Sequence, residues 1–505
     1  MPPSMADQQR GYSPRPPFGR HLQLSPTVAT IALAVSFAPM TLAHGGHHED
    51  KIPEGQTISP DPIDATLWVH IFLQGFAFGI LFPLGMVLGI IKNRWHVPLQ
   101  VLATTISLLG YALGHLHSGR QFHPKNVHAM AANPLFLLMT GQVVLGAYLK
   151  LHLEKGIHGR IRPFIRLLHS INGKAFPIYA WVQMVFGGIT ALGFCQGDHL
   201  GQCLAHFIMG GAFIAYGVIL TIMLLVGQLW LRRTGRSQEF FDSAVIAAWG
   251  CVNTFTEHRW GTEWVKNDWQ HTTMGIIWWS AGLVGIWLSR GRDGAPRRNF
   301  IPGFVILITG WAMSAHPQEL MISAETHKMF GYTLMGAGLA RIVEIAFILK
   351  DKASLSEDPT EISSFQYIPV FLLYAAGFLF MGATEEQMAL VSGSGIDHVA
   401  YTLILYSLAS LLFLFVMALI HIYDRAVNPN PKHKSIALGN GRVPSGAEDV
   451  RIRDANEFEL DGLVSDDEDE ESAARRKLLR DDGTEIEAPL GSASTLGGNS
   501  QRVVS

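Results

Sequence analysis

The sequence predicts an all-α, polytopic integral membrane protein with about eleven transmembrane helices and a disordered acidic C-terminal tail. Only 16% of the 505 residues are charged, against about a quarter in a globular protein. Of the 79 charged side chains, 28 lie in the segment 423–505, so the segment 1–422 has a membrane composition. The sequence has no concentration of basic residues that would indicate nucleic-acid binding. Three cysteines without a C-x-x-C pair exclude a disulfide scaffold, a thiolate zinc site and an iron–sulfur cluster.

The segment 1–43 is typical of a secretory signal peptide. Arg10, Arg15 and Arg20 precede the apolar run TVATIALAVSFAPM, and small residues surround Ala43. Cleavage there leaves a His-rich leader over residues 44–64, on the lumenal or extracellular side, in the plasma membrane or an endomembrane. Its start, HGGHHED, could bind copper or zinc, and a flexible leader without an ion is an equal alternative. The segment before the apolar run is longer than in most signal peptides, so the alternative is an uncleaved membrane anchor.

Apolar stretches of bilayer length, about 20 residues of helix, recur from Leu67 onward. The expected spans are 67–91, 98–118, 128–149, 172–194, 204–230, 240–256, 272–289, 300–315, 326–349, 365–385 and 398–422. The span 240–256 is the weakest, because Asp242 and Asn253 lie within it. Lysine and arginine concentrate in short cytosolic loops, and omitting this span would put the four-arginine loop 290–298 outside. We therefore keep it, which predicts a cytosolic C-terminus.

Residues 423–505 contain the run SDDEDEES, scattered Gly, Ser and Pro, and few aromatic residues. Such a segment cannot bury enough apolar area to offset the entropy of ordering it. We expect a disordered cytosolic tail.

A histidine lies at the start of each of the first four expected helices. Intramembrane histidine is usually retained because it binds a partner or a metal. The topology places His70 and His128 at the outer side and His96 and His169 at the inner side. Imidazole is an axial haem ligand and also suits copper, zinc or iron. Two pairs at two depths therefore predict two metal centres, on the order of 25 to 30 Å apart.

These segments resemble the cytochrome b561 superfamily, a four-helix core that holds two haems between two pairs of histidines. The resemblance lies in His70-Ile-Phe-Leu followed by LFPLGMVLG, in His96-Val-Pro-Leu-Gln, in His128 with Gln142, and in His169-Ser-Ile-Asn-Gly-Lys. It implies haem b, with an outer haem on His70 and His128 and an inner haem on His96 and His169. Gly173, four residues after His169, would let a flat macrocycle lie against the helix.

Two departures and one alternative accompany this resemblance. Pro98 crowds the second ligand, and Asn172 stands where an apolar residue is expected. His115 and His117 lie at the outer end of the second helix, and either one in place of His96 would remove the inner centre. The alternative for all four positions is a histidine at the membrane interface that bonds to headgroups or backbone carbonyls.

The second half resembles a fungal family of yeast transmembrane proteins through DWQHTTMGIIWWSAGLVGIWLSR, ETHKMFGYTLMGAGLARIVEI and SFQYIPVFLLYAAGFLFMGATEEQ. The resemblance implies a multi-span fungal membrane protein with electron-transport character and no settled activity. This half repeats His-x-x-x-Gly at His206, His271 and His327, each at the outer start of a helix, and the same side holds His398, His316, His258 and His199. The candidates for a third haem or a metal site are His206, His271, His327 and His398. The alternative is that the His-x-x-x-Gly motif recurs by chance, because the chain has 51 glycines.

Two further features concern structure. Cys195 and Cys203 flank an outer loop, where an oxidising compartment would permit a disulfide. Glu325, Arg341 and Glu344 are expected to form an internal ion pair rather than a proton relay.

Together these features predict five segments: a signal peptide (1–43), the leader (44–64), a cytochrome b561-like four-helix domain (65–194), a fungal transmembrane domain (195–422) and the tail (423–505). The leading function is a membrane haem protein that carries electrons from a cytosolic donor to an extracytoplasmic acceptor, either a metal ion or a small molecule. The alternatives are a divalent metal transporter or sensor that uses the outer histidines, and a membrane scaffold without a cofactor. Motifs of soluble enzymes are absent from the sequence: it has no P-loop and no Ser-His-Asp signature.

Overall fold

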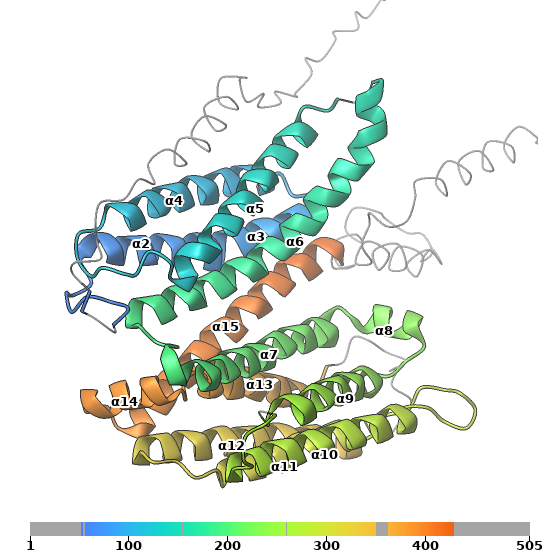
Figure 1. Ribbon diagram of the computed structural model, residues 1–505. Helices are drawn as coiled ribbons and strands as arrows, with labels where there is room; N and C mark the ends of the chain where they lie inside the picture. The colour runs from blue at the N-terminus through green and yellow to red at the C-terminus, as the bar shows by residue number, and fades with distance from the viewer. Residues whose placement is uncertain (1–51, 54–55, 154, 259, 350–361, 429–505) are drawn as a thin grey trace, which may run out of the picture.

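The computed structural model describes residues 52–53, 56–153, 155–258, 260–349 and 362–428, and these ranges are helical (Figure 1). Within them, the β contacts are two isolated bridges, Ile58–Phe122 and Arg290–Pro296. The expected signal peptide, the first part of the leader and most of the tail lie outside the described residues. The all-α prediction is confirmed.

Each of the eleven expected spans corresponds to a helix. The helices are α2 (Ala65–Phe76), which continues through the π-helix η3 (Ala77–Leu81) into α3 (Phe82–Ile90), then α4 (His96–Leu116), α5 (Val127–Lys150), α6 (Ile157–Leu192), α7 (Leu200–Leu225), α8 (Gln228–Thr234), α9 (Gln238–Thr256), α10 (Lys266–Leu288), α11 (Ile301–Ser314), α12 (Met321–Val343) with the π-helix η5 (Glu344–Ile348), α13 (Tyr367–Met381), α14 (Glu385–Ser394) and α15 (His398–Val427).

Eight helical segments of the described residues are long and apolar enough to cross a membrane. They comprise α2–α3, α4, α5, α6, α7, α12, α13 and α15. The polytopic architecture is therefore confirmed, but the count of eleven spans is not. Helix α11 is apolar but short, while polar residues such as Asp242 in α9 and Asp268 in α10 lower the hydropathy of those two helices.

The helices form two groups, α2–α6 and α7–α14, with α15 between them (Figure 1). Helix α15 packs against α13 and α7 on one side and α3 on the other. Its buried residues Ala409, Leu412 and Val416 share an apolar cluster with Tyr374 of α13, and Trp181 of α6 packs against that cluster. The last helix of the second group thus joins the two groups.

The described structure extends beyond both ends of the expected helical segments, which run from 65 to 422. Helix α15 continues to Val427, so the tail boundary at 423 falls inside a helix and is wrong by several residues. The apolar residues Val416 and Ile420 keep this helix packed to its last turns. At the other end, residues 56–64 of the leader are ordered against the loop after α4, where the Ser59 amide donates to the Gln121 carbonyl (3.0 Å).

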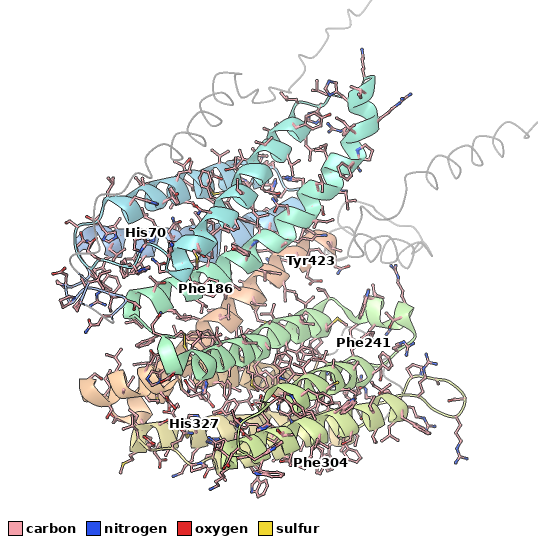
Figure 2. All side chains as sticks on the ribbon, in the orientation of Figure 1. His70, Phe186, Phe241, Phe304, His327 and Tyr423 are labelled. Carbon is pink, nitrogen blue, oxygen red and sulfur yellow. A yellow bond between two sulfur atoms is a disulfide. The ribbon has the colours of Figure 1, made fainter. Side chains whose placement is uncertain are left out.

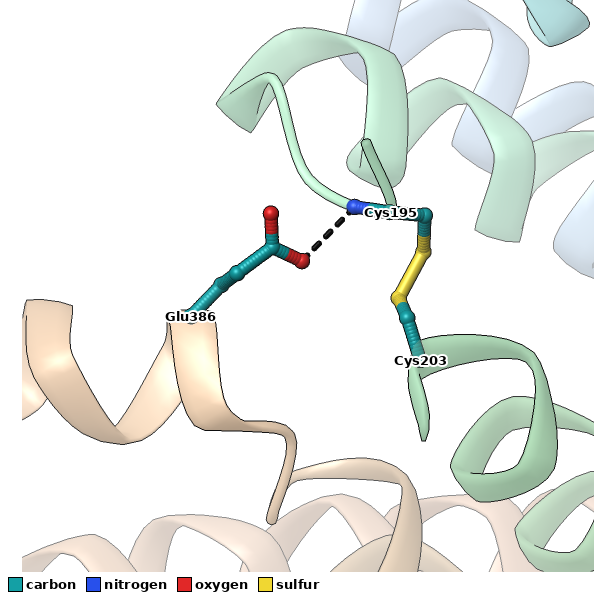
Figure 3. Close-up of side chains that lie close together, drawn as sticks. All are labelled: Cys195, Cys203 and Glu386. Atoms are coloured by element: carbon teal, nitrogen blue, oxygen red, sulfur yellow. Dashed lines mark hydrogen bonds between the residues drawn. A yellow bond between two sulfur atoms is a disulfide. The ribbon is translucent and has the colours of Figure 1, made fainter. Parts of the chain in front are cut away.

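Cys195 and Cys203 are joined by a disulfide, with their Cα atoms 5.3 Å apart (Figure 3). A carboxylate oxygen of Glu386, from α14, accepts a hydrogen bond from the Cys195 amide at 2.7 Å. The bridge connects the end of α6 to the start of α7 and therefore links the two helix groups. Both sulfurs are used in this bond, so the Cys195, Cys203 and Glu386 cluster is not a metal site. We call this end of the molecule the disulfide end.

We expect thiol alkylation of the denatured, unreduced protein to modify one cysteine per chain, and three after reduction. The sequence has three cysteines, and Cys251 is the one outside the disulfide. Intact-protein mass spectrometry of the full chain counts the added groups. Cys251→Ser serves as the control, because it should remove the single label and leave the pair protected. Labelling of all three cysteines without reductant would contradict the disulfide.

Candidate functional site

The four histidines predicted in the first helices meet as two pairs. The His70 and His128 rings, from α2 and α5, have centres 6.2 Å apart, and the His96 and His169 rings, from α4 and α6, have centres 6.4 Å apart. The planes are nearly perpendicular in both pairs, at 89° and 83°. Two imidazole nitrogens on opposite sides of one metal lie about 4 Å apart, which puts the ring centres about 6 Å apart. Both pairs have this spacing.

Backbone carbonyls hold three of the four rings through Nδ1. The Nδ1 atoms of His70 and His96 lie 2.7 Å from the carbonyl oxygens of Gly110 and Gly85. His128 Nδ1 lies 3.3 Å from the Gln183 carbonyl and 2.9 Å from the Gln183 side-chain Nε2. A ring that donates from Nδ1 keeps the lone pair on Nε2, the usual arrangement in a metal-binding histidine. His169 differs, because its buried Nδ1 has no hydrogen bond within the described residues, while Gln142 donates to its backbone carbonyl.

A glycine on a neighbouring helix faces every ring. A Cβ added at Gly114 would lie 2.6 Å from His70 Nδ1, and one at Gly89 would lie 2.8 Å from His96. A Cβ at Gly187 would be 3.3 Å from His128, and one at Gly146 would be 3.2 Å from His169. A side chain at the first two positions would displace the ring. The glycines therefore decide where the histidines can lie.

These contacts reveal a repeat along the four helices. In each of α4, α5 and α6, a histidine stands at position i, and residues i+14 and i+18 contact a histidine of a neighbouring helix. Residue i+14 contacts that histidine through its carbonyl or its side-chain amide, and residue i+18 is the glycine that faces its ring. The three sets are His96, Gly110 and Gly114; His128, Gln142 and Gly146; and His169, Gln183 and Gly187. Each helix thus supplies a ligand at one level and a glycine at the other. These offsets along a helix correspond to about 21–27 Å between the levels.

Helix α2–α3 has the same repeat with one additional residue, since Gly85 and Gly89 stand at i+15 and i+19 from His70. The π-helix Ala77–Leu81 lies between these positions. A π turn accommodates one more residue than an α turn, and such turns are frequent at functional sites. Pro83, which has no N–H to donate, is the second residue of the following helix α3. The π-helix thus restores the register of Gly85 and Gly89 with His96.

Buried aromatic side chains fill the bundle between the two levels. Phe78 and Phe82 lie between His70 and Gly85 on their helix, and Phe176 lies between His169 and Gln183 on α6. The ring centres of Phe82 and Phe176 are 4.9 Å apart, and those of Phe78 and Phe176 are 5.7 Å apart. The two levels are therefore separated by a packed apolar layer.

The His96 ring is the one that faces His169, while the ring of the alternative ligand His117 packs on Phe122 with centres 5.7 Å apart. His115 is exposed, with Nδ1 3.0 Å from its own helix at the Tyr111 carbonyl. Pro98 lies in the first turn of α4, where the backbone N–H has no helical partner to lose. The unexpected Asn172 donates to the Leu138 carbonyl and to Gln142, each at 2.9 Å, and so joins α6 to α5.

Gly173 faces a side chain of the neighbouring helix α5. A Cβ at Gly173 would lie 2.7 Å from Gln142 Nε2, so this glycine makes room for the Gln142 side chain. The glycine that faces the His169 ring is Gly146, on the neighbouring helix.

The second group of helices gathers three of the four further candidates and one histidine not among them. The His206 and His327 rings are 5.9 Å apart, His327 and His316 are 6.2 Å apart, and His316 and His271 are 5.4 Å apart. His398 does not belong to this chain of rings, because it is exposed at the start of α15. Figure 2 shows His327 in the second group of helices and His70 in the first. His316, in the α11–α12 turn, was placed at the same outer side by the predicted topology but was not chosen as a candidate, because it follows no His-x-x-x-Gly pattern.

Burial holds the pKa of His316 at about 4, with the neighbouring His271 and His327 adding to the effect. His316 is therefore neutral near pH 7. At the solvent side of the chain of rings, His271 Nδ1 lies 3.2 Å from a carboxylate oxygen of Glu257.

The glycines of the three His-x-x-x-Gly motifs have a packing role. A Cβ at Gly210 would lie 2.7 Å from the Gly377 carbonyl of α13, and one at Gly331 would lie 2.5 Å from the Gly310 carbonyl of α11. A Cβ at Gly275 would similarly meet Thr254 of α9 at 2.7 Å. Helix backbones occupy these faces, so the motif leaves no surface there for a flat macrocycle.

Comparison with known proteins places both halves of the chain. Residues 179–424 match the family model described as protein YTP1-like, C-terminal, and residues 50–152 match a domain of unknown function, DUF2427. The chain is 44% identical to protein YTP1 of Saccharomyces cerevisiae over 310 residues, which cover 61% of the chain and 64% of that protein. The second half of the chain is therefore similar to YTP1-like membrane proteins, and the chain spans less than two thirds of the length of protein YTP1.

A more distant relative covers more of its own length. An uncharacterized membrane protein of Schizosaccharomyces pombe is 21% identical, over 63% of this chain and 86% of that protein. A second uncharacterized membrane protein of Saccharomyces cerevisiae is 24% identical over 44% of the chain and 42% of that protein. No solved structure matches the chain.

The two family models divide the paired histidines. The DUF2427 model, which matches residues 50–152, includes His70, His96 and His128. The YTP1-like model begins at residue 179, after His169 but before Gln183 and Gly187. Because His128 contacts Gln183 and Gly187, the site joins sequence from both matched regions.

The YTP1-like region also contains a buried network of charges. Arg341 donates to Glu344 and to Glu239 of α9, each at 2.7 Å, and Arg298 donates to Glu239 at 3.0 Å. The expected pairing of Arg341 with Glu344 is present, but Glu325 is not part of it. Glu325 pairs with Lys328 at 2.7 Å on a more exposed face of α12. The network borders a largely apolar cavity of about 410 Å³, into which Asp242 and Tyr216 also project.

Proposed function

We propose that helices α2–α6 bind two haem b groups, one at each histidine level, and that this protein carries electrons across its membrane. The donor would be cytosolic, and the acceptor would be a metal ion or small molecule on the other side. The observation that supports this most strongly is the fourfold repeat of histidine and glycine, which gives two facing imidazole pairs at 6.2 and 6.4 Å. A chance set of interface histidines would have no reason to repeat its partners at nearly constant spacing in four helices.

The residues present fit the proposed group. Haem, when bound, would supply one-electron redox chemistry. His70 and His128 would hold one group, and His96 and His169 the other. The carbonyls of Gly110 and Gly85 orient two of these rings and keep the proton on Nδ1. Phe78, Phe82 and Phe176 keep water out of the layer between the levels.

Two features support the direction of transfer. The disulfide lies beside the His128 level, and stable disulfides occur in oxidising compartments. Arg160, Arg162 and Arg166 lie in the first turns of α6, before His169, and basic residues concentrate at the cytosolic side. The His96 and His169 level would therefore face the cytosolic donor.

We expect the purified full-length protein, expressed with ample haem, to contain two haem groups per chain. A reduced-minus-oxidised visible spectrum combined with haem quantification measures this number. A variant with alanine at all four positions, His70, His96, His128 and His169, should contain none, while His115→Ala should retain both. Absence of haem from the unsubstituted protein would refute the proposed function.

A further inference from the structure

We propose that His206, His316 and His327 form a binding site for one divalent transition-metal ion, separate from the paired histidines of the first four helices. The site lies where α7 and α12 begin, at the disulfide end. It does not depend on haem binding by α2–α6. Imidazole nitrogens are preferred ligands of zinc and copper.

The first support is a set of buried nitrogens that lack partners. His206 is 9% exposed, its Nδ1 lies 2.9 Å from the Gln202 carbonyl, and its Nε2 is buried without a hydrogen bond within the described residues. His327 is 4% exposed, and its Nδ1 lies 2.8 Å from the Ser323 carbonyl. In both rings Nδ1–H donates a hydrogen bond to the carbonyl, which leaves the lone pair on Nε2.

His316 supplies the third ring. Its Nε2 is also buried without a hydrogen bond in the part of the chain that the structure describes, while its Nδ1 lies 3.2 Å from the Pro317 carbonyl and 2.9 Å from Gln318 Nε2. A buried polar atom without a partner is unfavourable and calls for an explanation. A bound cation would satisfy the orphaned nitrogens of His206 and His316 together.

The spacing of the rings supports a shared ion. Zinc–imidazole bonds of about 2.0–2.1 Å place the centres of two rings on one ion roughly 5–6 Å apart. The observed separations are 5.9 Å for His206 and His327 and 6.2 Å for His327 and His316. Among the described residues, the nitrogens of the three rings do not all lie within 4.8 Å of one another, so ion binding would require a rearrangement of these side chains.

Neighbouring residues provide a route from solvent. His271 stacks on His316 with an angle of 13° between the planes, and Glu257 lies 3.2 Å from His271. Both side chains are partly exposed, at 29% and 28%. A carboxylate beside an imidazole attracts a cation to the entrance. On the other side, the Phe380 ring stacks on His206 at 4.5 Å and closes the site.

The same surroundings favour an ion over a third haem. The glycines that follow His206 and His327, Gly210 and Gly331, pack directly against α13 and α11. The i+14 and i+18 pattern of the first four helices is also absent, because Leu220 and Arg341 occupy the i+14 positions of these two histidines.

Zinc binding to the full-length protein tests the proposal. The starting protein should carry His44→Ala, His47→Ala and His48→Ala, so that the leader does not bind zinc. After EDTA treatment and desalting, calorimetry measures affinity for Zn²⁺ and elemental analysis counts zinc per chain. We expect one equivalent, and at least a tenfold loss of affinity in His206→Ala, His327→Ala and His316→Ala.

His199→Ala and His398→Ala are the matched controls, because both histidines are exposed at the same end and should leave zinc binding unchanged. His316→Ala changes a turn residue, so it remains informative if a helix variant fails to elute as a single species. His70→Ala and His96→Ala should also retain the zinc equivalent, which keeps this result distinct from the haem proposal. Absence of zinc from the starting protein, or unchanged affinity in all three ligand variants, would overturn the site.

Discussion

His70→Ala is expected to remove one of the two haem spectral components, and His96→Ala to remove the other. His128→Ala should reproduce the first result and His169→Ala the second, because a ring that loses its partner no longer completes the axial pair. The levels lie about 21–27 Å apart, so the two losses should be independent. Haem content should fall from two per chain to one in every single variant.

Two glycine variants test whether haem binding depends on the position of the His70 ring. Gly114→Ala would place a Cβ 2.6 Å from His70 Nδ1 and should weaken the His70 component alone. Gly141→Ala is the matched control, because nothing lies within 4 Å of the Cβ that it adds. Loss of the same component in His70→Ala and His96→Ala, or of both components in each, would contradict the assignment to two levels.

The second large effect is expected from Arg341→Ala, which should destabilise the folded protein by about 3–5 kcal/mol. Arg341 is 13% exposed and bonds to Glu239 and Glu344, which are 0% and 2% exposed. Its removal leaves Glu344 without its cation and Glu239 with Arg298 alone. Such a loss corresponds to a fall of roughly 10 °C in the unfolding midpoint, which size-exclusion chromatography after heating can follow in detergent.

Lys328→Ala provides the matched control for this change. Lys328 also pairs with a glutamate on α12, but both side chains are substantially exposed, at 43% and 33%. Exposed pairs contribute little, so the unfolding midpoint should stay close to that of the unsubstituted protein. Arg341→Lys should be intermediate, because an ammonium keeps the charge but loses the planar fork that reaches two carboxylates. Equal midpoints for Arg341→Ala and Lys328→Ala would contradict a stabilising role for the network.

Much of the fold could be predicted because apolar length is recorded directly in the sequence. All eleven expected spans are helical, and the doubtful span 240–256 proves to be a helix whose polar residues Glu239 and Asp242 face a buried network. The number of membrane crossings could not be settled this way. A helix such as α9 can remain among membrane-spanning neighbours when its charges are paired inside the protein.

The candidate site could be predicted only in part from the sequence. His70, His96, His128 and His169 were identified from their positions at helix ends. Their glycine partners were missed, although the i+14 and i+18 pattern is visible in the sequence once it is known. The additional residue in α2–α3 and the substitution of glutamine for glycine in α5 and α6 concealed it.

The sequence alone determined which segments are helical, which residues are charged and how far apart histidines and glycines lie along each helix. The tertiary structure decided which rings meet, that His316 rather than His398 joins His206 and His327, and that Glu239 rather than Glu325 bonds to Arg341. The physical reason is that helical periodicity specifies the face on which a residue lies. Which faces come together depends on packing between helices distant in sequence, here set by glycines that admit a neighbouring backbone or ring.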